Sequence, residues 1–379
     1  MILPGATLGM LGGGQLGRMF AVAARTLGYR VCVLDPDPVS PAGTMADEHL
    51  CARFDDADSL RRMAESCDAV TTEFENIPAG TVRALESRCI VHPSAHALEA
   101  TQDRSREKTF IRDLGLPTSA FRTVRNAGEL ATAVDELRMP CILKRASLGY
   151  DGKGQFSVSD IGTARRGFAA EGEVPSVLEE RIDLEREISV ILSRHESGLV
   201  RCFPVAENEH RHGILDVTIV PARISPALAD EARQLATRLA EALEYVGVMA
   251  VEFFVTGSGR LLVNEIAPRP HNSGHYTLDA CVSSQFEQQV RMLCGLPPGD
   301  TRLLTPVVMT NLLGDLWSAG TPPWERLFAE PGIKLHLYGK TEPRPGRKMG
   351  HFCYLHEDTR HARARSHELH AELGGEPVT

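Results

Sequence analysis

Long apolar runs, closely spaced cysteine pairs and an excess of basic charge are all missing from this sequence, and each absence excludes a class of protein. No stretch of about 18 uninterrupted apolar residues occurs, so we expect no transmembrane helix and no membrane partner. The nine cysteines are scattered, odd in number and never spaced as Cys-x-x-Cys, which argues against a disulfide framework and favours a reduced, cytoplasmic compartment. With 41 basic and 50 acidic residues the net charge is -9, so broad electrostatic binding to nucleic acid is not expected. Any anionic partner must therefore be small and held locally.

The 379 residues suffice for two or three domains, each with its own core. The first hundred residues alternate short apolar runs at Thr7–Leu11, Arg30–Leu34 and Ala69–Thr72 with helical stretches such as 15–27. This rhythm predicts a parallel sheet with crossover helices. A further helix is expected over 103–114, and the first domain boundary is placed near it.

The rest of the sequence predicts a smaller unit and then a larger one, so that the whole chain combines α/β and α+β organisation. Strands of the smaller unit flank a glycine-rich loop, and the larger unit holds an amphipathic helix followed by a hairpin. The expected strands lie at 141–144, 155–158, 176–179, 186–192, 246–255, 260–266, 307–312 and 334–338, the amphipathic helix at 226–243, and a peripheral helix within 356–379.

The motif Gly12-x-Gly14-x-x-Gly17 follows the first expected strand and opens a helix, and Asp35 stands at the end of the next strand. Such glycines let backbone N–H groups at a helix N-terminus approach a phosphate or a ribose, as in a dinucleotide fingerprint. A dehydrogenase is therefore one hypothesis. The alternative is a tight turn without a cofactor, because the same turn occurs in many doubly wound sheets.

A second glycine-rich loop, from Gly149 to Gln155, lies between two expected strands, with Lys144 at the end of the first. A strand, loop and strand of this kind can fold over a triphosphate, with main-chain donors and a lysine charge against its oxygens. It is not a Walker loop, because no Gly-Lys-Ser/Thr precedes a helix. The alternative is a mobile hairpin tip with a solvated lysine.

Two carboxylates, Glu252 and Glu265, lie on the two strands of the expected hairpin. If the hairpin turns symmetrically at Gly257-Ser258, Glu252 lies opposite Val263 and Glu265 lies diagonally across on the same face. The apolar residues around Glu252 make two acids costly there unless a cation compensates them. Two carboxylates with nucleotide phosphates are ligands that Mg²⁺ prefers. An exposed strand face or an internal salt bridge is the alternative.

A polar loop begins at the second carboxylate and contains Arg269, His271 and Asn272. These side chains would offer cationic and neutral donors to a small oxyanion beside the metal. His271 and His275 are four residues apart, but the flanking prolines disfavour a helix and His-Glu-x-x-His is absent, so zinc is not expected. Either histidine, taken singly, can also be structural.

Two further stretches are suited to small ligands. Glu73 and Glu75 follow a predicted parallel strand, at the edge where open α/β sheets place ligands, and could hold an amine or a sugar hydroxyl. A basic group further along the chain could receive a phosphate monoester or could form a solvated loop. It consists of Lys340, Arg344, Arg347 and Lys348.

Five motifs stand in order along nearly the whole chain. They are Gly14-Gln15-Leu16-Gly17-Arg18-Met19, Glu73-Phe74-Glu75-Asn76, Gly149-Tyr150-Asp151-Gly152-Lys153-Gly154-Gln155, Asn264-Glu265-x-Ala267-Pro268-Arg269-x-His271-Asn272-Ser273-Gly274-His275 and Arg344-Pro345-Gly346-Arg347-Lys348-x-Gly350-His351. Together they closely resemble the 5-(carboxyamino)imidazole ribonucleotide synthase family, the ATP-grasp carboxylases of purine biosynthesis. The resemblance implies an ATP-grasp architecture, with an N-terminal Rossmann-like (pre-ATP-grasp) domain at 1–108, a small lid domain at 109–184, and a large domain with a C-terminal substrate-binding segment at 185–379.

The resemblance also implies a reaction. ATP, bicarbonate and 5-aminoimidazole ribonucleotide would give N5-carboxyaminoimidazole ribonucleotide, ADP and phosphate through carboxyphosphate, with Mg²⁺ as the metal. The partners would be these small molecules and a second copy of the chain in a homodimer.

The site residues that the resemblance implies fall into three groups. Nucleotide contacts are implied for Arg104, Lys144, Gly149, Tyr150, Asp151, Gly152, Lys153, Gly154, Gln155, Glu179, Glu180, Arg181, Ile182, Glu187, His210, Asn264 and Glu265, and magnesium ligands for Glu252 and Glu265. Arg269, His271 and Asn272 would bind the bicarbonate-derived oxyanion, and Asp151 would transfer a proton. The ribonucleotide would contact Tyr150, Lys153, Lys340 and Arg347, with Glu73 or Glu75 at its sugar.

Besides the dehydrogenase, two rivals share the ATP-grasp class. A formate-dependent glycinamide ribonucleotide transformylase would use another acid and amine, and a non-catalytic relative would have little need for both metal acids and Lys144. The Arg-x-His-Asn-Ser-Gly-His loop and the Arg-Pro-Gly-Arg-Lys tail favour the carboxylase. Nicotinamide binding, formate-dependent turnover, or nucleotide binding without turnover would identify each rival.

Overall fold

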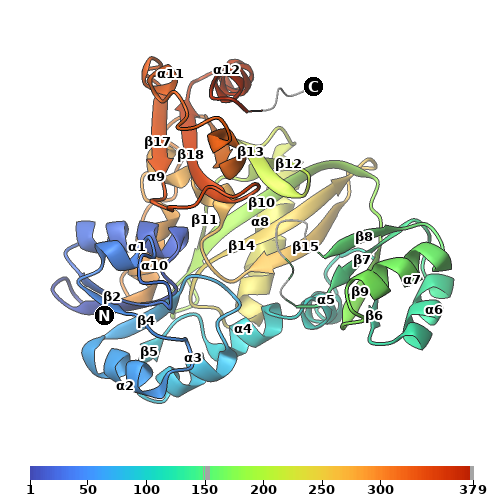
Figure 1. Ribbon diagram of the computed structural model, residues 1–379, viewed down its shortest axis with the longest axis horizontal. Helices are drawn as coiled ribbons and strands as arrows, with labels where there is room; N and C mark the ends of the chain where they lie inside the picture. The colour runs from blue at the N-terminus through green and yellow to red at the C-terminus, as the bar shows by residue number, and fades with distance from the viewer. Residues whose placement is uncertain (148, 150–153, 376–379) are drawn as a thin grey trace.

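The computed structural model describes residues 1–147, 149 and 154–375, and its strands form three sheets (Figure 1). The first is a parallel sheet of order β3-β2-β1-β4-β5. Its strands are β1 (Thr7–Leu11), β2 (Arg30–Leu34), β3 (Glu48–Leu50), β4 (Ala69–Thr72) and β5 (Ile90–Val91), and its helices are α1 (Gln15–Thr26), α2 (Ala57–Ser66), α3 (Ala79–Glu86) and α4 (Ala95–Thr101), with a short 3-10 helix, η1 (Gly43–Met45). Strands β1 and β4 are buried along their whole length, as parallel strands covered on both faces should be. The predicted strands and crossover helices of this region are confirmed.

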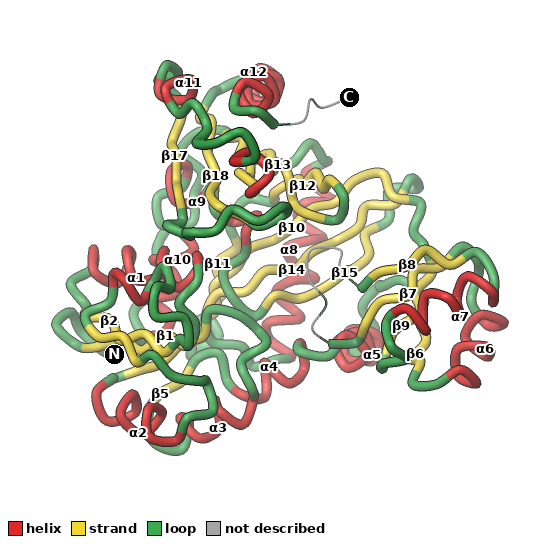
Figure 2. Tube along the Cα trace, in the orientation of Figure 1, coloured by secondary structure: helices red, strands yellow, loops and turns green. Residues whose placement is uncertain are grey.

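The second sheet is antiparallel, with the order β6-β9-β7-β8. Its elements are β6 (Phe121–Val124), α6 (Ala127–Glu136), β7 (Cys141–Arg145), β8 (Gln155–Val158), α7 (Ile161–Ala170) and β9 (Ser176–Glu180), preceded by α5 (Arg104–Asp113). Figure 2 shows α6 and α7 beside this sheet, and Leu130 of α6 and Phe168 of α7 share one core with Leu143 and Leu178 of the strands. The small sheet therefore has a core of its own.

The third sheet has nine strands, in the order β15-β14-β10-β12-β13-β16-β18-β17, with β11 paired to β10. The strands are β10 (Leu184–Arg194), β11 (Val200–Cys202), β12 (Ala206–Arg211), β13 (Ile214–Val220), β14 (Gly247–Thr256), β15 (Leu261–Ala267), β16 (Val307–Leu313), β17 (Ile333–Leu337) and β18 (Lys348–Leu355). The helices are α8 (Pro226–Ala242), η2 (Asn272–Gly274), α9 (Thr277–Ala280), α10 (Gln285–Leu293), η3 (Gly314–Trp317), α11 (Glu325–Phe328) and α12 (Thr359–Glu372). Ser225 caps the N-terminus of α8 by accepting from the Leu228 N–H, and Pro226 occupies its first turn, which fixes where the predicted helix begins.

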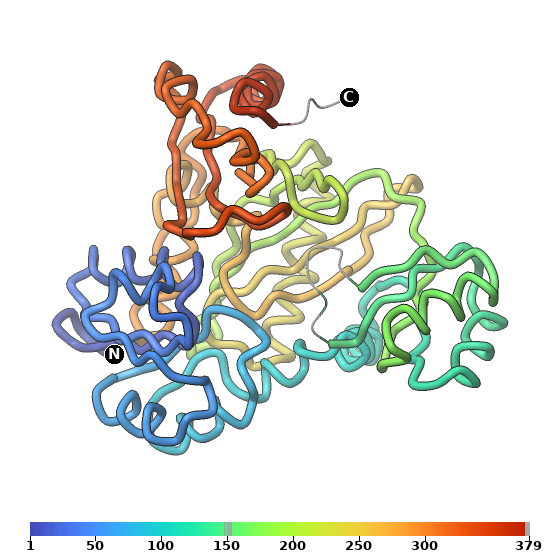
Figure 3. Tube along the Cα trace, viewed as in Figure 1, coloured from blue at the N-terminus to red at the C-terminus, as the bar shows by residue number. Residues whose placement is uncertain are grey.

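The N-terminal sheet and the large sheet share a hydrophobic core. Phe20 of α1 packs in the same cluster as Phe286 of α10 and Tyr338, which follows β17. Figure 3 shows the orange loop between β17 and β18 beside the blue N-terminal helix. There, the Lys340 amine donates to Gln15 Oε1 at 2.6 Å. The loop between β17 and β18 therefore contacts the N-terminal helix, although they are more than 300 residues apart in the sequence.

The register of the β14–β15 hairpin corrects one prediction. Glu252 pairs with Glu265 and not with Val263, which pairs with Phe253. Asn264 is the extra residue of a β-bulge between these two pairs. The two glutamates are therefore directly opposite each other and not diagonal, which brings their side chains closer than a regular ladder would.

Over the described ranges, no helix combines the length and the apolar character that a membrane span requires.

Candidate active site

A cavity of about 1220 Å³ lies where the three sheets meet. Every residue to which the family resemblance assigns a site role lines this cavity, within the part of the chain that the structure describes. They are Glu73, Glu75, Arg104, Lys144, Gly149, Gly154, Gln155, Glu179, Glu180, Arg181, Ile182, Glu187, His210, Glu252, Asn264, Glu265, Arg269, His271, Asn272, Lys340 and Arg347. Tyr150, Asp151, Gly152 and Lys153 lie outside the described residues. The roles of all these residues stay predictions, but the described ones share one space.

One wall of the cavity is a buried cluster of charges around Glu179, on β9. The Arg104 Nε lies 2.5 Å from Glu179 Oε1, and the amines of Lys108 and Lys144 both lie 3.4 Å from Glu179 Oε2. Burial alone would raise the pKa of Glu179, but the three cations outweigh burial and hold it well below its usual range. Three cations around one carboxylate leave a net positive wall, which suits the phosphate oxygens of a nucleotide.

Lys108 and Glu107 also belong to this charged wall, although neither was predicted from the sequence. The Lys108 side chain is fully buried, and its amine donates to Thr118 Oγ1 at 2.5 Å and to Ser119 Oγ at 2.7 Å. Burial lowers the pKa of Lys108 to about 8. Glu107 accepts from the Ile266 N–H at 2.5 Å and so ties α5 to the carboxylate hairpin. Only Phe110 and Ile111 of α5 are apolar, so the sequence pattern predicts an exposed polar face and does not mark Glu107 or Lys108 as buried.

Arg104 connects the small domain to the hairpin. Its Nη2 donates to Asn264 Oδ1 at 3.0 Å and its Nη1 to Glu265 Oε2 at 3.3 Å, in addition to the contact with Glu179. The guanidinium is predicted to contact nucleotide phosphates. Here it holds the bulged strand β15 against β9, so it positions both walls of the cavity.

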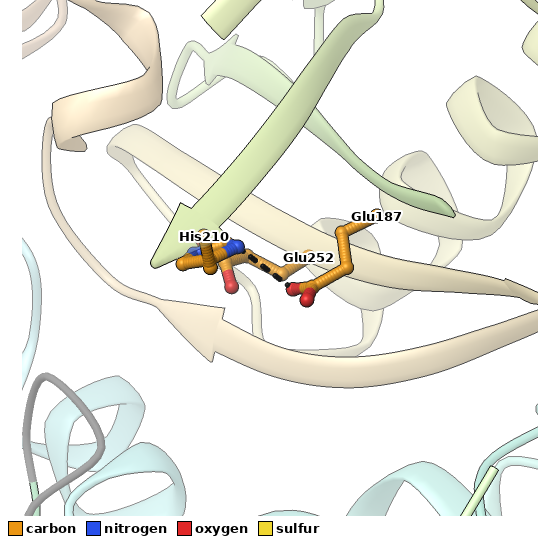
Figure 4. Close-up of side chains that lie close together, drawn as sticks. All are labelled: Glu187, His210 and Glu252. Atoms are coloured by element: carbon orange, nitrogen blue, oxygen red, sulfur yellow. Dashed lines mark ion pairs between the residues drawn. The ribbon is translucent and has the colours of Figure 1, made fainter. Parts of the chain in front are cut away.

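The floor of the cavity carries acidic side chains from adjacent strands of the large sheet (Figure 4). His210 Nδ1 on β12 lies 3.1 Å from Glu187 Oε2 on β10, and these two residues with Glu252 on β14 bring ligand atoms within 4.8 Å of one another. Burial, reinforced by Glu265, raises the pKa of Glu252 to about 8. Burial would lower the pKa of His210, but the carboxylate of Glu187 outweighs it and raises that pKa to about 8. A buried carboxylate, Glu252, directly opposite the half-exposed Glu265 and beside Glu187 fits a divalent cation.

The loop after β15 is fastened to the N-terminal domain. Arg269 forms a bidentate ion pair with Glu75, in which Nε contacts Oε2 and Nη2 lies 3.2 Å from Oε1. Burial alone would lower the pKa of Arg269, but Glu75 outweighs it and raises the pKa further, so the guanidinium stays charged. His271 Nε2 lies 3.4 Å from Glu252 Oε1. Asn272 is buried, and neither atom of its amide has a hydrogen-bond partner among the described residues. An unpaired buried amide facing a cavity is a ready binding group for a ligand.

Gln285, in the first turn of α10, fixes the backbone of this loop. Its Oε1 accepts from the His271 N–H and its Nε2 donates to the His271 carbonyl, both at 2.9 Å. A Cβ on Gly274 would lie 2.5 Å from the same Oε1, so the close approach requires glycine. Gly274 belongs to a motif found in the sequence, but Gln285 was missed, because the contact joins two elements that only the fold brings together.

The first glycine-rich turn does not hold a dinucleotide. Glu73 occupies the N-terminus of α1, where its carboxylate accepts from the N–H groups of Gly14 at 2.5 Å and Leu16 at 3.1 Å. Asp35 Oδ2 accepts from the Gly13 N–H at 2.6 Å. A protein carboxylate thus takes the place that a pyrophosphate would need. Burial raises the pKa of Glu73.

The basic segment after β17 contributes three of its four residues to the cavity. Lys340, Arg347 and Lys348 line it, whereas Arg344 is exposed and paired with Glu342. The Lys340 amine donates to the Lys348 carbonyl at 2.6 Å, in addition to its bond to α1. Three basic residues, Lys340, Arg347 and Lys348, thus stand at the end of the cavity opposite the small domain.

Comparison with known proteins agrees with this geometry. Residues 5–102 match the ribonucleotide synthetase preATP-grasp domain, 109–286 the ATP-grasp domain, and 307–365 the phosphoribosylaminoimidazole carboxylase C-terminal domain. The chain is 44% identical over 355 residues to N5-carboxyaminoimidazole ribonucleotide synthase of Bacillus subtilis (strain 168), covering 94% of this chain and 93% of that one.

Solved structures give the same result. An ADP complex of N5-carboxyaminoimidazole ribonucleotide synthetase superposes with a TM-score of 0.93 at 44% identity, covering 98% of this chain and 97% of the other. An Aspergillus clavatus synthase in complex with ADP and 5-aminoimidazole ribonucleotide gives 0.89 at 30% identity, covering 97% and 98%. The fold and the cavity define an ATP-grasp ligase, which excludes the dehydrogenase. More narrowly, the chain belongs to the N5-carboxyaminoimidazole ribonucleotide synthase family.

Proposed function

We propose that the chain carboxylates 5-aminoimidazole ribonucleotide with bicarbonate and ATP, giving N5-carboxyaminoimidazole ribonucleotide, ADP and phosphate in purine biosynthesis. The observation that carries this proposal is the single cavity in which a cationic wall, opposed carboxylates and the Arg269 to Asn272 loop meet. The cationic wall suits the phosphates of ATP, the carboxylates suit its magnesium ion, and the loop suits bicarbonate. Their presence in one cavity supports a reaction between these reactants and the ribonucleotide. The proposed division of the chain is 1–108, 109–184 and 185–379.

At the nucleotide end, Lys144 and Arg104 would neutralise phosphate oxygens, together with backbone donors of the loop from Gly149 to Gln155. The adenine would lie against the backbone of 180–182. The Glu179 carboxylate is not free to contact the base, because three cations already surround it. Glu187 would accept the ribose hydroxyls, and His210, which contacts Glu187, would keep that carboxylate in place.

Magnesium would be held by Glu252 and Glu265. Their direct opposition across the hairpin supports this, as does the raised pKa of Glu252, because an ionised Glu252 is unfavourable in its buried position without a cation. The ion would supply charge neutralisation at the phosphate oxygens of the nucleotide. Arg104, which bonds to Asn264 and Glu265, would orient the second ligand.

The bicarbonate would lie against Arg269, His271 and Asn272. A bicarbonate oxygen attacks the γ-phosphorus and ADP leaves, so that carboxyphosphate forms. The exocyclic amine of the ribonucleotide then bonds to the carboxyl carbon, phosphate leaves, and the amine loses a proton. The donors of the loop would stabilise the negative charge that develops on the carboxyl oxygens. Asp151, which lies outside the described residues, is the proposed acceptor of the proton.

The ribonucleotide would be held by its phosphate at Lys340 and Arg347, with Tyr150 and Lys153 from the glycine-rich loop. Glu73 or Glu75 would contact the sugar. The Glu73 carboxylate accepts from backbone N–H groups, and the Glu75 carboxylate is paired with Arg269. We further propose a homodimer, as the family resemblance implies, and a cytoplasmic location, which the nine unpaired cysteines support.

The test is release of ADP from magnesium-ATP, with bicarbonate and the ribonucleotide omitted in turn. We expect the ribonucleotide to stimulate ADP release and carboxylated product to require bicarbonate. Folded protein that binds ATP but shows no stimulation by the ribonucleotide would refute the substrate. Turnover with formate and glycinamide ribonucleotide in its place would favour the transformylase.

A further inference from the structure

A chain of buried polar side chains runs from the large sheet to His271. Ser273 Oγ lies 2.9 Å from His271 Nδ1 and 2.8 Å from Ser189 Oγ. Asn208 Nδ2 donates to Ser189 Oγ at 3.0 Å, and Thr218 Oγ1 donates to Asn208 Oδ1 at 3.1 Å. We call Thr218, Asn208, Ser189 and Ser273 the polar relay. All four are buried, and Thr218, Ser189 and Ser273 completely so, which removes competition from solvent.

The direction of the relay follows from one backbone contact. The Ser273 N–H lies 3.3 Å from His271 Nδ1, and a backbone N–H can only donate. Nδ1 therefore presents a lone pair and carries no proton, so the Ser273 hydroxyl must also donate to it. Ser273 Oγ then accepts from the Ser189 hydroxyl, whose own oxygen accepts from Asn208. Every member thus donates toward the histidine, and no two hydrogens of the relay point at each other.

The rest of the surroundings agree with a neutral ring. Burial, together with the charge of Arg269, holds the pKa of His271 well below its usual range. Gln285 fixes the peptide groups on both sides of the same residue. Gln285 thus fixes the backbone of His271, and Ser273 fixes the orientation of its ring. What remains to be determined is which ring nitrogen carries the proton.

We propose that Ser273 is a positioning residue that locks His271 in the neutral tautomer protonated at Nε2. The Nε2–H then points to the cavity side, where Glu252 Oε1 lies 3.4 Å away. His271 acts there as a fixed hydrogen-bond donor to Glu252 and to the bicarbonate-derived oxyanion. The other tautomer would turn a lone pair toward both acceptors and repel them. This inference rests on the proposed function, and it rules out His271 as the group that takes the proton from the amine.

The spectroscopic test uses the whole chain with nitrogen-15 in its imidazole rings. His271→Gln identifies the two His271 ring signals by their loss. Wild type should show an unprotonated Nδ1 and a protonated Nε2. Ser273→Ala keeps only the longer backbone contact to Nδ1, at 3.3 Å, and should therefore add a population protonated at Nδ1. Ser193→Ala is the matched control, because Ser193 lies on the same strand as Ser189, is equally buried, and has an Oγ without a hydrogen-bond partner among the described residues.

The kinetic test separates positioning from folding. Ser273→Ala should lower kcat about tenfold, the equivalent of one hydrogen bond, while KM for magnesium-ATP changes less than about twofold. Ser193→Ala should leave both unchanged. Ser189→Ala removes the donor behind Ser273 without touching the loop, so it should produce a smaller change in the same direction and serves if Ser273→Ala does not fold.

A protonated Nδ1 in the wild type would overturn the inference. So would serine variants whose spectra and kcat match those of Ser193→Ala. The spectra need no substrate, which keeps the two hypotheses apart. An Nε2–H tautomer that depends on Ser273, in protein without ribonucleotide-stimulated ADP release, would support the lock and refute the proposed function.

Discussion

Glu107 makes the stability of the chain depend on pH in a defined direction. The side chain is 3% exposed, and its Oε1 accepts from the Ile266 N–H. Burial, opposed by the charge of Arg104 and reinforced by that of Glu265, raises its pKa from 4.5 to about 8. Between these values the carboxyl is protonated in the folded protein and ionised in the unfolded chain. Its contribution to stability is complete below pH 4.5 and is lost as the pH rises through 8.

The magnitude follows from the size of that window. One pKa unit corresponds to about 1.4 kcal/mol, so the free energy of unfolding should fall by at most about 5 kcal/mol across it through Glu107 alone. Glu107→Gln cannot ionise, and its amide oxygen still accepts from the Ile266 N–H. The variant should therefore resemble wild type near pH 5 and exceed it in stability at pH 8.5, by up to about 5 kcal/mol.

Urea unfolding followed by circular dichroism at pH 5 and 8.5, without nucleotide or magnesium, measures the difference. Glu65→Gln, at an exposed position on α2, is the control and should change with pH as wild type does. Equal m values would confirm that the unfolded states are comparable. If Glu107→Gln and wild type lost stability in parallel between the two pH values, the assignment of a protonated, buried carboxyl would be wrong.

Three further substitutions test the cavity. Glu252→Gln removes one of the two proposed magnesium ligands, so it should lower ATP turnover at least about hundredfold, without recovery at high magnesium. Recovery at high magnesium would mean that Glu252 is not a ligand of the metal. Glu75→Gln removes the charge that pairs with the buried Arg269, so urea unfolding should show a free energy of unfolding lower by about 3 kcal/mol. The same variant should have a raised KM for bicarbonate, and an unchanged KM would mean that Arg269 does not bind bicarbonate. Gly274→Ala places a Cβ 2.5 Å from Gln285 Oε1 and should lower the free energy of unfolding by about 1–3 kcal/mol, whereas wild-type stability would mean that the loop can shift.

The elements that the sequence predicted well are those whose burial shows in their composition. Strands β1, β2, β4 and β8 have the bounds expected from apolar runs, and the glycine-rich and polar motifs indicated the cavity lining before the fold was known. Strands β3, β5, β6, β11, β12, β13 and β18 were not predicted. In β12 the reason is clear, because AENEHR carries one apolar residue and four charged or titratable ones. Its Glu207 is buried nevertheless, since Arg223 lies 2.5 Å from its carboxylate. A strand stabilised by ion pairs has no hydrophobic period to read.

Contacts between distant segments account for the rest of what the sequence could not give. The bulge at Asn264 changes which residue faces Glu252, and no local pattern marks it. Lys108 and Gln285 look like ordinary polar residues of amphipathic helices, yet both are fully buried because their partners come from other elements. Sequence motifs identify residues that would touch ligands, whereas the residues that hold those side chains in place become visible only in three dimensions.

The core shared by α1 and α10 decides how this chain can be dissected. Sequence divides it into three segments, but Phe20 of the first segment packs with Phe286 and Tyr338 of the last. A fragment ending near residue 108 would carry an uncovered apolar helix face and should aggregate when expressed alone. The four-stranded unit, whose core is closed within itself, is the part that could be excised or exchanged between relatives as a module.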